Sequence, residues 1–274
     1  MHYLLALRAD NPARSCQDYV NELAEAFGIQ VSRSSISRFF LERFNFAGSF
    51  RKPILVPLDK FKITNVTKYY EFMFKVNELY DHTRWVFFDE KHLVNMDTLN
   101  GKVRANPLTG AVDAIGVSGD FRTAYTLIAA ITVNPFKQRS MCYSISENNG
   151  DSAAFMSFIR SLIMSGWLSR GDVACMDNAR IHTGGESTWL ADLLWNFQMP
   201  DGQPLNVLLV LLPPRCPELN PIELVFHIVA RRIRSLRVRS GLGPCDREVV
   251  RYSSVVMDHI SFETIAKCYV HCGY

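Results

Sequence analysis

The order of apolar segments in residues 84–240 is the feature that most constrains the fold of this chain. The strand-like segments are 84–88, 125–133, 141–145, 173–176 and 207–211, and the helical ones are 151–165, 186–197 and 222–239. Strand pairs come first, and strands then alternate with helices. This order predicts an α/β fold class, with a mixed sheet covered by helices on both faces.

Residues 1–52 read as three short helices without strand-like alternation. The apolar stripe of the third helix is Ile36, Phe39, Phe40 and Phe44. Its exposed side carries Arg33, Ser35 and Arg38, which are predicted DNA-contacting residues if this is a helix-turn-helix whose second helix enters the major groove. A plain three-helix packing unit has the same periodicity and stays an alternative.

The remaining segments complete the predicted domain organisation. Residues 53–83 are expected to form a linker with an amphipathic helix near 65–79, and residues 241–274 a C-terminal helical tail after the domain 84–240. No stretch approaches the roughly 18 apolar residues of a membrane helix. We therefore expect an intracellular protein without a membrane partner, nuclear if its source is eukaryotic.

Cysteine spacing excludes two function classes. The seven cysteines are scattered and contain no C-x-x-C pair. This pattern argues against a disulfide framework and against a zinc knuckle. Buried, reduced thiols are the expected state.

Basic side chains concentrate in the last predicted helix of the domain 84–240. The net charge is only +3, yet five arginines follow Glu223 before the next acid at Asp246: Arg231, Arg232, Arg234, Arg237 and Arg239. A solvated helix face is the simpler explanation. However, helical spacing places Glu223, Arg231 and Arg234 on one side, and this favours contact with nucleic-acid phosphates.

Three carboxylates are placed where a sheet of this class binds ligands. Asp89 and Asp177 each follow an apolar strand, and Glu223 lies in the first turn of a helix after a proline-rich run. Asn220 is expected to cap that helix. Asp is also a common turn residue, and acids in a first turn favour the helix dipole. Three such acids nevertheless form a candidate site for Mg²⁺, which prefers carboxylate oxygens.

Neighbouring side chains are expected to have smaller roles. Strand alternation sends Glu90 to the face opposite Asp89. His92 and His182 are more readily explained as turn histidines bonded to backbone, and Asn178 as orienting Asp177 or capping the turn. The tryptophans expected in the core rather than on a base-stacking surface are Trp167, Trp189 and Trp195.

These motifs together resemble one family. The segments FFDE, MDNARIH, LPPRCPELNPIE and YVHCGY, preceded by a helix-turn-helix, resemble the mariner-type (Tc/mariner) DDE transposases. The resemblance implies a ribonuclease-H-like catalytic domain in which Asp89, Asp177 and Glu223 are the catalytic, metal-binding triad. It further implies two Mg²⁺ or Mn²⁺ ions. One would activate water or a DNA 3′-hydroxyl for attack on a phosphodiester, and the other would stabilise the leaving oxygen.

The implied partners are double-stranded DNA, as transposon ends and target, and a second copy of the chain in a homodimer on DNA. Three features depart from the family pattern. Asp177 and Glu223 are 46 positions apart, which is longer than usual, Phe226 replaces a common tryptophan, and one helix-turn-helix stands where two are common. A domesticated or decayed DNA-binding protein without turnover stays an alternative, as does a metal hydrolase of small phosphate esters.

Overall fold

The computed structural model describes residues 2–10, 15–44, 57–79, 81–94, 124–147, 152–177, 187–240 and 248–274. The chain divides into two compact units, Met1–Pro57 and Leu58–Tyr274.

The smaller unit packs three helices around a small core. The helices are α1 (His2–Asp10), α2 (Cys16–Phe27) and α3 (Arg33–Phe44). One buried side chain from each helix forms the centre of this core: Leu4, Tyr19 and Ile36. Ser15 and Asp18 form a capping box at the start of α2, and Gly28 ends it with a φ of 65°, which favours glycine. Ser32 Oγ accepts the Ser35 N–H at 3.1 Å and so caps α3.

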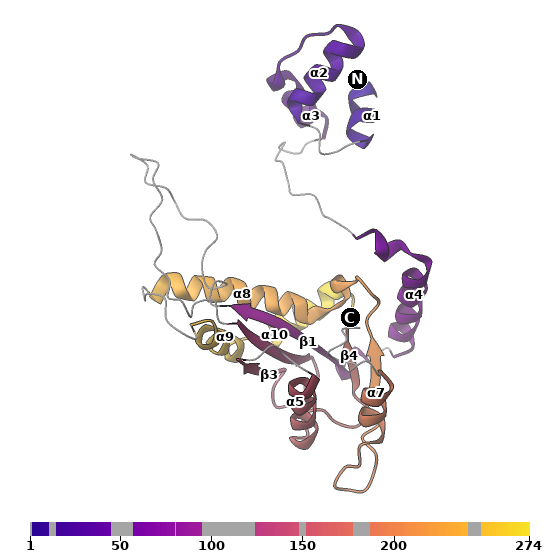
Figure 1. Ribbon diagram of the computed structural model, residues 1–274, viewed down its shortest axis with the longest axis vertical. Helices are drawn as coiled ribbons and strands as arrows, with labels where there is room; N and C mark the ends of the chain where they lie inside the picture. Colours follow the sequence, from indigo (N-terminus) through magenta and orange to yellow (C-terminus); the bar gives the residue numbers. More distant parts are fainter. Residues whose placement is uncertain are drawn as a thin grey trace. The chain divides into compact units, whose positions relative to one another are not determined.

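The larger unit contains a mixed sheet and the helices that cover it (Figure 1). The strands are β1 (Trp85–Val94), β2 (Ala124–Thr132), β3 (Met141–Ser146), β4 (Val173–Met176) and β5 (Leu208–Leu211). The α-helices are α4 (Ile63–Glu78), α5 (Ser152–Met164), α7 (Ser187–Asn196), α8 (Pro221–Ser240), α9 (Glu248–Asp258) and α10 (Phe262–Cys272). Short 3-10 turns are η1 (Leu58–Phe61), η2 (His82–Arg84) and η5 (Pro217–Leu219).

The strand order in the sheet is β3-β2-β1-β4-β5. β1, β2 and β3 pair antiparallel, whereas β4 is parallel to both β1 and β5. The expected mixed sheet is therefore confirmed. β1 is the central strand, so it is bordered on one side by the antiparallel part and on the other by the parallel part.

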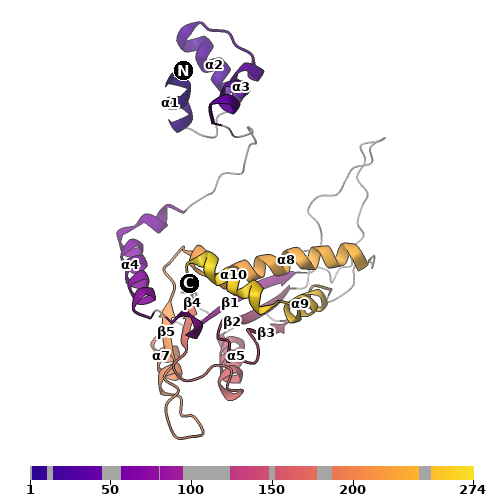
Figure 2. The ribbon, with the colours of Figure 1, turned by 180° about the vertical axis from the view of Figure 1, so that it is seen from behind.

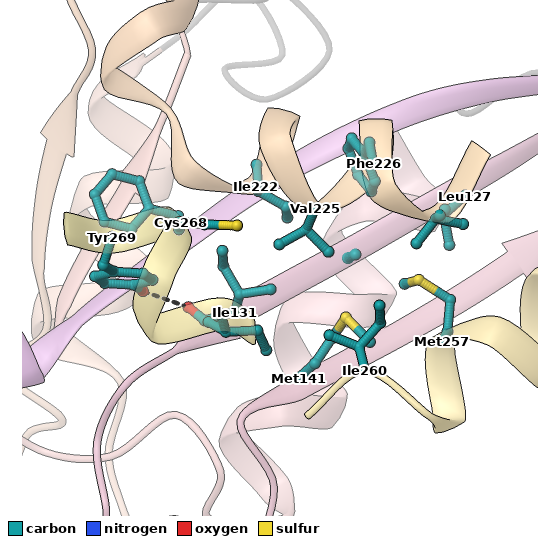
Figure 3. Close-up of a cluster of buried hydrophobic side chains, with 14 of the residues drawn as sticks. Leu127, Ile131, Met141, Ile222, Val225, Phe226, Met257, Ile260, Cys268 and Tyr269 are labelled. Atoms are coloured by element: carbon teal, nitrogen blue, oxygen red, sulfur yellow. Dashed lines mark hydrogen bonds between the residues drawn. The ribbon is translucent and has the colours of Figure 1, made fainter. Parts of the chain in front are cut away.

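Helices cover both faces of this sheet, as Figures 1 and 2 show. α8, α9 and α10 pack on one face, where Phe87 and Leu127 of the sheet meet Val225 of α8 and Ile265 of α10. Figure 3 shows this core from the side of α8 and α10, with the hydroxyl of Tyr269 donating to the carbonyl of Ile131. α5 and α7 pack on the opposite face.

Two segments are attached to the core by specific contacts. α4, within the segment predicted as a linker, buries Phe72 and Val76 in the core beneath α8. The turn between β2 and β3 is held by Lys137, whose ammonium lies 2.6 Å from Asp172 Oδ2 before β4, with both side chains buried. These contacts make the sheet and its surrounding turns a single packed body.

The prediction that all three named tryptophans lie in the core is wrong for two of them. Trp167 is buried, but Trp189 and Trp195 on α7 are 46% and 49% exposed. α7 buries Leu190 and Leu194, which are four residues apart, and the two tryptophans lie off that stripe.

The structure describes six of the seven cysteines, of which Cys16 and Cys142 are half-buried. Six are free, and Cys175, Cys216, Cys268 and Cys272 are buried. Within the described residues, no helix combines the length and apolarity needed to cross a bilayer.

Candidate active site

Asp89 lies in the middle of a strand, which corrects the expectation that it ends one. β1 continues five residues beyond it because antiparallel pairing with β2 persists to Val94 opposite Ala124. Pairing with β4 covers only residues 85–87 of β1. Asp89 therefore sits at the carboxyl end of the parallel pair although its own strand runs on.

Asp177 follows β4 directly, and the strand register predicts that it lies at the same height along the parallel strands as Asp89. The register pairs Trp85 with Val173 and Phe87 with Cys175, and extending it by two residues sets Asp89 beside Asp177. All four paired side chains belong to the core under α8. Because side chains alternate along a strand, both aspartates face the side of the sheet that α8 covers, and neighbouring strands are about 4.8 Å apart.

Asn220 contacts the first of these acids directly. Its Nδ2 donates to Asp89 Oδ2 at 2.8 Å, and the backbone N–H of Glu90 donates to Asp89 Oδ1 at 2.8 Å. Asp89 is 7% and Asn220 2% exposed. The expected helix cap is not formed, because Asn220 Oδ1 has no hydrogen-bond partner among the described residues.

Glu223 lies one turn further along, in the first turn of α8, and its side chain is exposed. Its backbone N–H donates to the carbonyl of Asn220 at 3.1 Å. Two contacts fix the preceding turn η5. The hydroxyl of Tyr274 donates to the Leu219 carbonyl at 2.8 Å, and Lys60 of η1 pairs with Glu218. The turn that carries Glu223 is therefore anchored to the rest of the unit.

The residues present suit a hard divalent cation only in part. Asp89 and Asp177 offer carboxylate oxygens on one face, and the orphaned Asn220 oxygen is a further buried acceptor at this place. Across the described ranges, however, no three His, Cys, Asp or Glu side chains are close enough together to hold a metal ion. The register of β1 and β4 thus predicts that the two aspartates are neighbours, and Glu223 lies on the adjacent turn.

Lys91 is a cation near this place that the sequence argument did not single out. It lies on the same face of β1 as Asp89, and its Nζ is 6.0 Å from the centre of the Phe226 ring on α8. No described residue forms an ion pair or hydrogen bond with its ammonium. Strand alternation from Asp89 was the signal that could have identified it.

The predicted arginines of α8 lie on its outer side. Ile222, Val225, Val229 and Ile233 are buried. Glu223 and Arg231 are exposed, and Arg234 is half-buried. The helix therefore presents its acid and these arginines away from the core.

In the smaller unit, Arg33, Ser35 and Arg38 are exposed on α3. Ser35 is engaged locally, because its hydroxyl lies 3.0 Å from that of Ser32. Within the described part of this unit, no hydrogen bond or ion pair involves the side chain of Arg33 or Arg38. Arg33 and Arg38 remain the side chains there that are open to a ligand.

The other predicted neighbours have mixed outcomes. Glu90 follows Phe88 by two residues, and Phe88 packs on the face of α5, so alternation directs Glu90 to that face; His92 is exposed. Asn178 and His182 fall outside the described residues, as does the turn predicted near Asn100.

Comparisons with known proteins support this picture. The family model described as DDE superfamily endonuclease matches residues 84–241, more than half of the chain. No curated protein matches the sequence.

Several solved structures are similar. The mariner Mos1 paired end complex with Mg has a TM-score of 0.65 at 16% identity, over 98% of this chain and 75% of that one. The Mos1 strand transfer complex has a TM-score of 0.60 at 15% identity, over 100% and 78%. The Mos1 paired-end complex with left transposon end has a TM-score of 0.58 at 15% identity, over 99% and 78%. These matches confirm the ribonuclease-H-like fold.

Proposed function

The chain belongs to the DDE superfamily of endonucleases, and on that premise we propose that it is a transposase of the mariner type. It would hydrolyse phosphodiesters at transposon ends and transfer the resulting strand to target DNA. The observation that supports this proposal is the parallel register of β1 and β4, which pairs Phe87 with Cys175 and, continued by two residues, would set Asp89 beside Asp177. No described contact favours an inactive DNA-binding protein.

We propose Asp89, Asp177 and Glu223 as the residues that hold divalent metal, Mg²⁺ or Mn²⁺. Such ions, when bound, supply activation of the attacking oxygen and stabilisation of the leaving one. Asp89 is held by the amide of Asn220 and by the N–H of Glu90, so its carboxylate is oriented before metal arrives. Glu223 would complete the site from the first turn of α8.

DNA phosphates are the proposed ligands of the surrounding cations. Lys91 follows Asp89 by two residues on β1 and its ammonium lies near Phe226 of α8, and Arg231 and Arg234 extend the basic side of α8. Arg33 and Arg38 of α3 are proposed to contact the transposon end through the major groove. The similar structures include a paired-end complex with a transposon end, which supports a homodimer on DNA as the working assembly.

The experiment is incubation of the purified chain with end-labelled linear DNA and Mg²⁺ or Mn²⁺, with nicks resolved on a denaturing gel. Asp89→Asn, Asp177→Asn and Glu223→Gln each remove a charge at nearly constant volume. Because metal catalysis contributes several kcal/mol, each should slow nicking at least about 100-fold.

The control is DNA binding, measured by anisotropy without metal, which these three variants should retain. Nicking at the wild-type rate by any one of them would remove that residue from the mechanism. Absence of nicking by the wild-type chain on transposon-end DNA would contradict the proposed activity.

A further inference from the structure

Asn220 connects the first and third of the proposed acids. Its side-chain amide donates to Asp89 Oδ2 at 2.8 Å, and its backbone carbonyl accepts the N–H of Glu223 at 3.1 Å. The two bonded residues are 131 positions apart in sequence. One residue therefore fixes both the Asp89 carboxylate and the start of the helix that carries Glu223.

The bond to Asp89 constrains the orientation of the carboxylate. Both partners are at least nine-tenths buried, and a hydrogen bond to a charged acceptor is stronger than a neutral one. Since the Glu90 N–H holds the other oxygen, the carboxylate cannot rotate without breaking one of the two bonds. Asp89 is thus presented in a single orientation toward the face that it shares with Asp177.

The side-chain carbonyl oxygen of Asn220 argues against a purely structural role for this residue. Asn220 Oδ1 is buried and has no hydrogen-bond partner in the part of the chain that the structure describes. Leaving such an acceptor unsatisfied costs about 1–3 kcal/mol. A leucine of similar shape would fill the space without that penalty. The amide is therefore explained by what its N–H group does for Asp89.

The backbone on either side of Asn220 is also fixed. Tyr274 holds the carbonyl of Leu219, Lys60 pairs with Glu218, and Pro221 follows. A donor on a rigid backbone loses little entropy when it bonds, so it can set a geometry to within the tolerance that a metal site requires.

We propose that Asn220 is a positioning residue, which orients Asp89 and sets the start of α8 so that Asp89 and Glu223 bind the same divalent cation. The inference rests on the proposed function, because it concerns the metal held by those acids. Residues that orient metal ligands typically affect metal affinity or activity by about 10- to 100-fold.

The test is Mn²⁺ binding to the full chain without DNA, measured by titration calorimetry, alongside nicking. Asn220→Leu keeps the branched shape and the number of side-chain heavy atoms and removes the donor. We expect its Mn²⁺ dissociation constant to rise by about 10- to 100-fold and its nicking rate to fall by a similar factor. Its denaturation midpoint without metal should change little, because the loss of the hydrogen bond to Asp89 is offset by the removal of the unsatisfied oxygen.

Tyr274→Phe is the matched control. It removes the hydrogen bond to Leu219 in the same turn but leaves the Asn220 amide in place. Because the Lys60–Glu218 pair still holds the turn, we expect a lower denaturation midpoint and a loss of Mn²⁺ affinity clearly smaller than that of Asn220→Leu. If Tyr274→Phe weakens Mn²⁺ binding as much as Asn220→Leu, the integrity of the turn explains the effect and the proposal is overturned.

The remaining outcomes separate this inference from the proposed function. Wild-type nicking and Mn²⁺ binding together with wild-type affinity in Asn220→Leu would overturn the positioning role alone. A wild-type chain that neither binds Mn²⁺ nor nicks DNA would overturn both. If Asn220→Leu does not fold, Asn220→Ser, which keeps a donor, should bind Mn²⁺ more tightly than Asn220→Ala. Equal affinities of those two variants would contradict the role.

Discussion

Replacing Lys137 with methionine should strongly destabilise the larger unit, because it leaves a buried carboxylate without its cation. The side chains of Lys137 and Asp172 are 6% and 0% exposed, and the ammonium is 2.6 Å from Asp172 Oδ2. Breaking such a pair typically costs about 3–5 kcal/mol. The N–H and hydroxyl of Ser169 still donate to Asp172, at 2.8 and 3.1 Å, so we expect about 3 kcal/mol.

The assay is denaturant unfolding of the full chain followed by tryptophan fluorescence. All four tryptophans lie in the Leu58–Tyr274 unit, so the signal reports that unit alone. In a thermal melt, 3 kcal/mol corresponds to a decrease of about 6–12 °C for a unit of this size. A second variant, Lys137→Met combined with Asp172→Leu, should recover much of the loss because no buried charge remains.

Lys267→Met provides a control with the same chemistry at an exposed pair. Lys267 and Glu263 are 3.3 Å apart on α10 but 76% and 79% exposed. Such pairs contribute about 0–1 kcal/mol, so the midpoint should hardly move. If Lys137→Met is as mild as Lys267→Met, or if the double variant is less stable than the single one, the argument from buried charge is refuted.

Three further predictions concern DNA and pH. Lys91→Gln should slow nicking by about 10-fold, the effect of losing roughly 1.4 kcal/mol of phosphate interaction, while its unfolding midpoint stays within error; unchanged nicking would remove Lys91 from the site. In fluorescence anisotropy, Arg38→Ala should weaken binding to a selected DNA sequence more than binding to random duplex. Arg231→Ala should weaken binding to both DNAs and reduce the slope of log affinity against log salt by about 1; equal losses of affinity for the two DNAs in Arg38→Ala would contradict this division of roles. Burial raises the pKa of Tyr269 well above its usual value, so the unfolded chain loses the phenol proton first and the free energy of unfolding should fall as pH rises above about 10. In Tyr269→Phe, denaturation curves measured at alkaline pH should show a smaller fall of stability with pH.

Local pattern was sufficient for most elements of the fold. The run of apolar residues predicted β4 at its observed bounds, because all four of its side chains are buried. The end of β1 was predicted too early, since the polar residues after Asp89 resemble a turn. Pairing with β2 over those residues overrides the local preference, and that pairing is between segments distant in sequence.

The acids of the candidate site could be predicted from the sequence, but the residue that holds the first of them in place could not. Strand alternation alone places Asp89 and excludes Glu90. The bond from Asn220 to Asp89 could not be predicted, because an asparagine before a helix is most simply a cap and its partner lies 131 positions away. The exposure of Trp189 was missed for a related reason, since hydrophobic character does not reveal which side of a short helix meets the sheet.

The contacts that anchor η5 affect the order in which the two units can fold during synthesis of the chain. Leu219 is held by Tyr274, 55 positions later, and Glu218 by Lys60, 158 positions earlier. The smaller unit closes through contacts within its own short helices, so it can form while the rest is still being made. The turn that carries Asn220 and Glu223 can be fixed only after α10 has emerged. On the proposed function, the nascent chain would therefore recognise DNA before it could cut it.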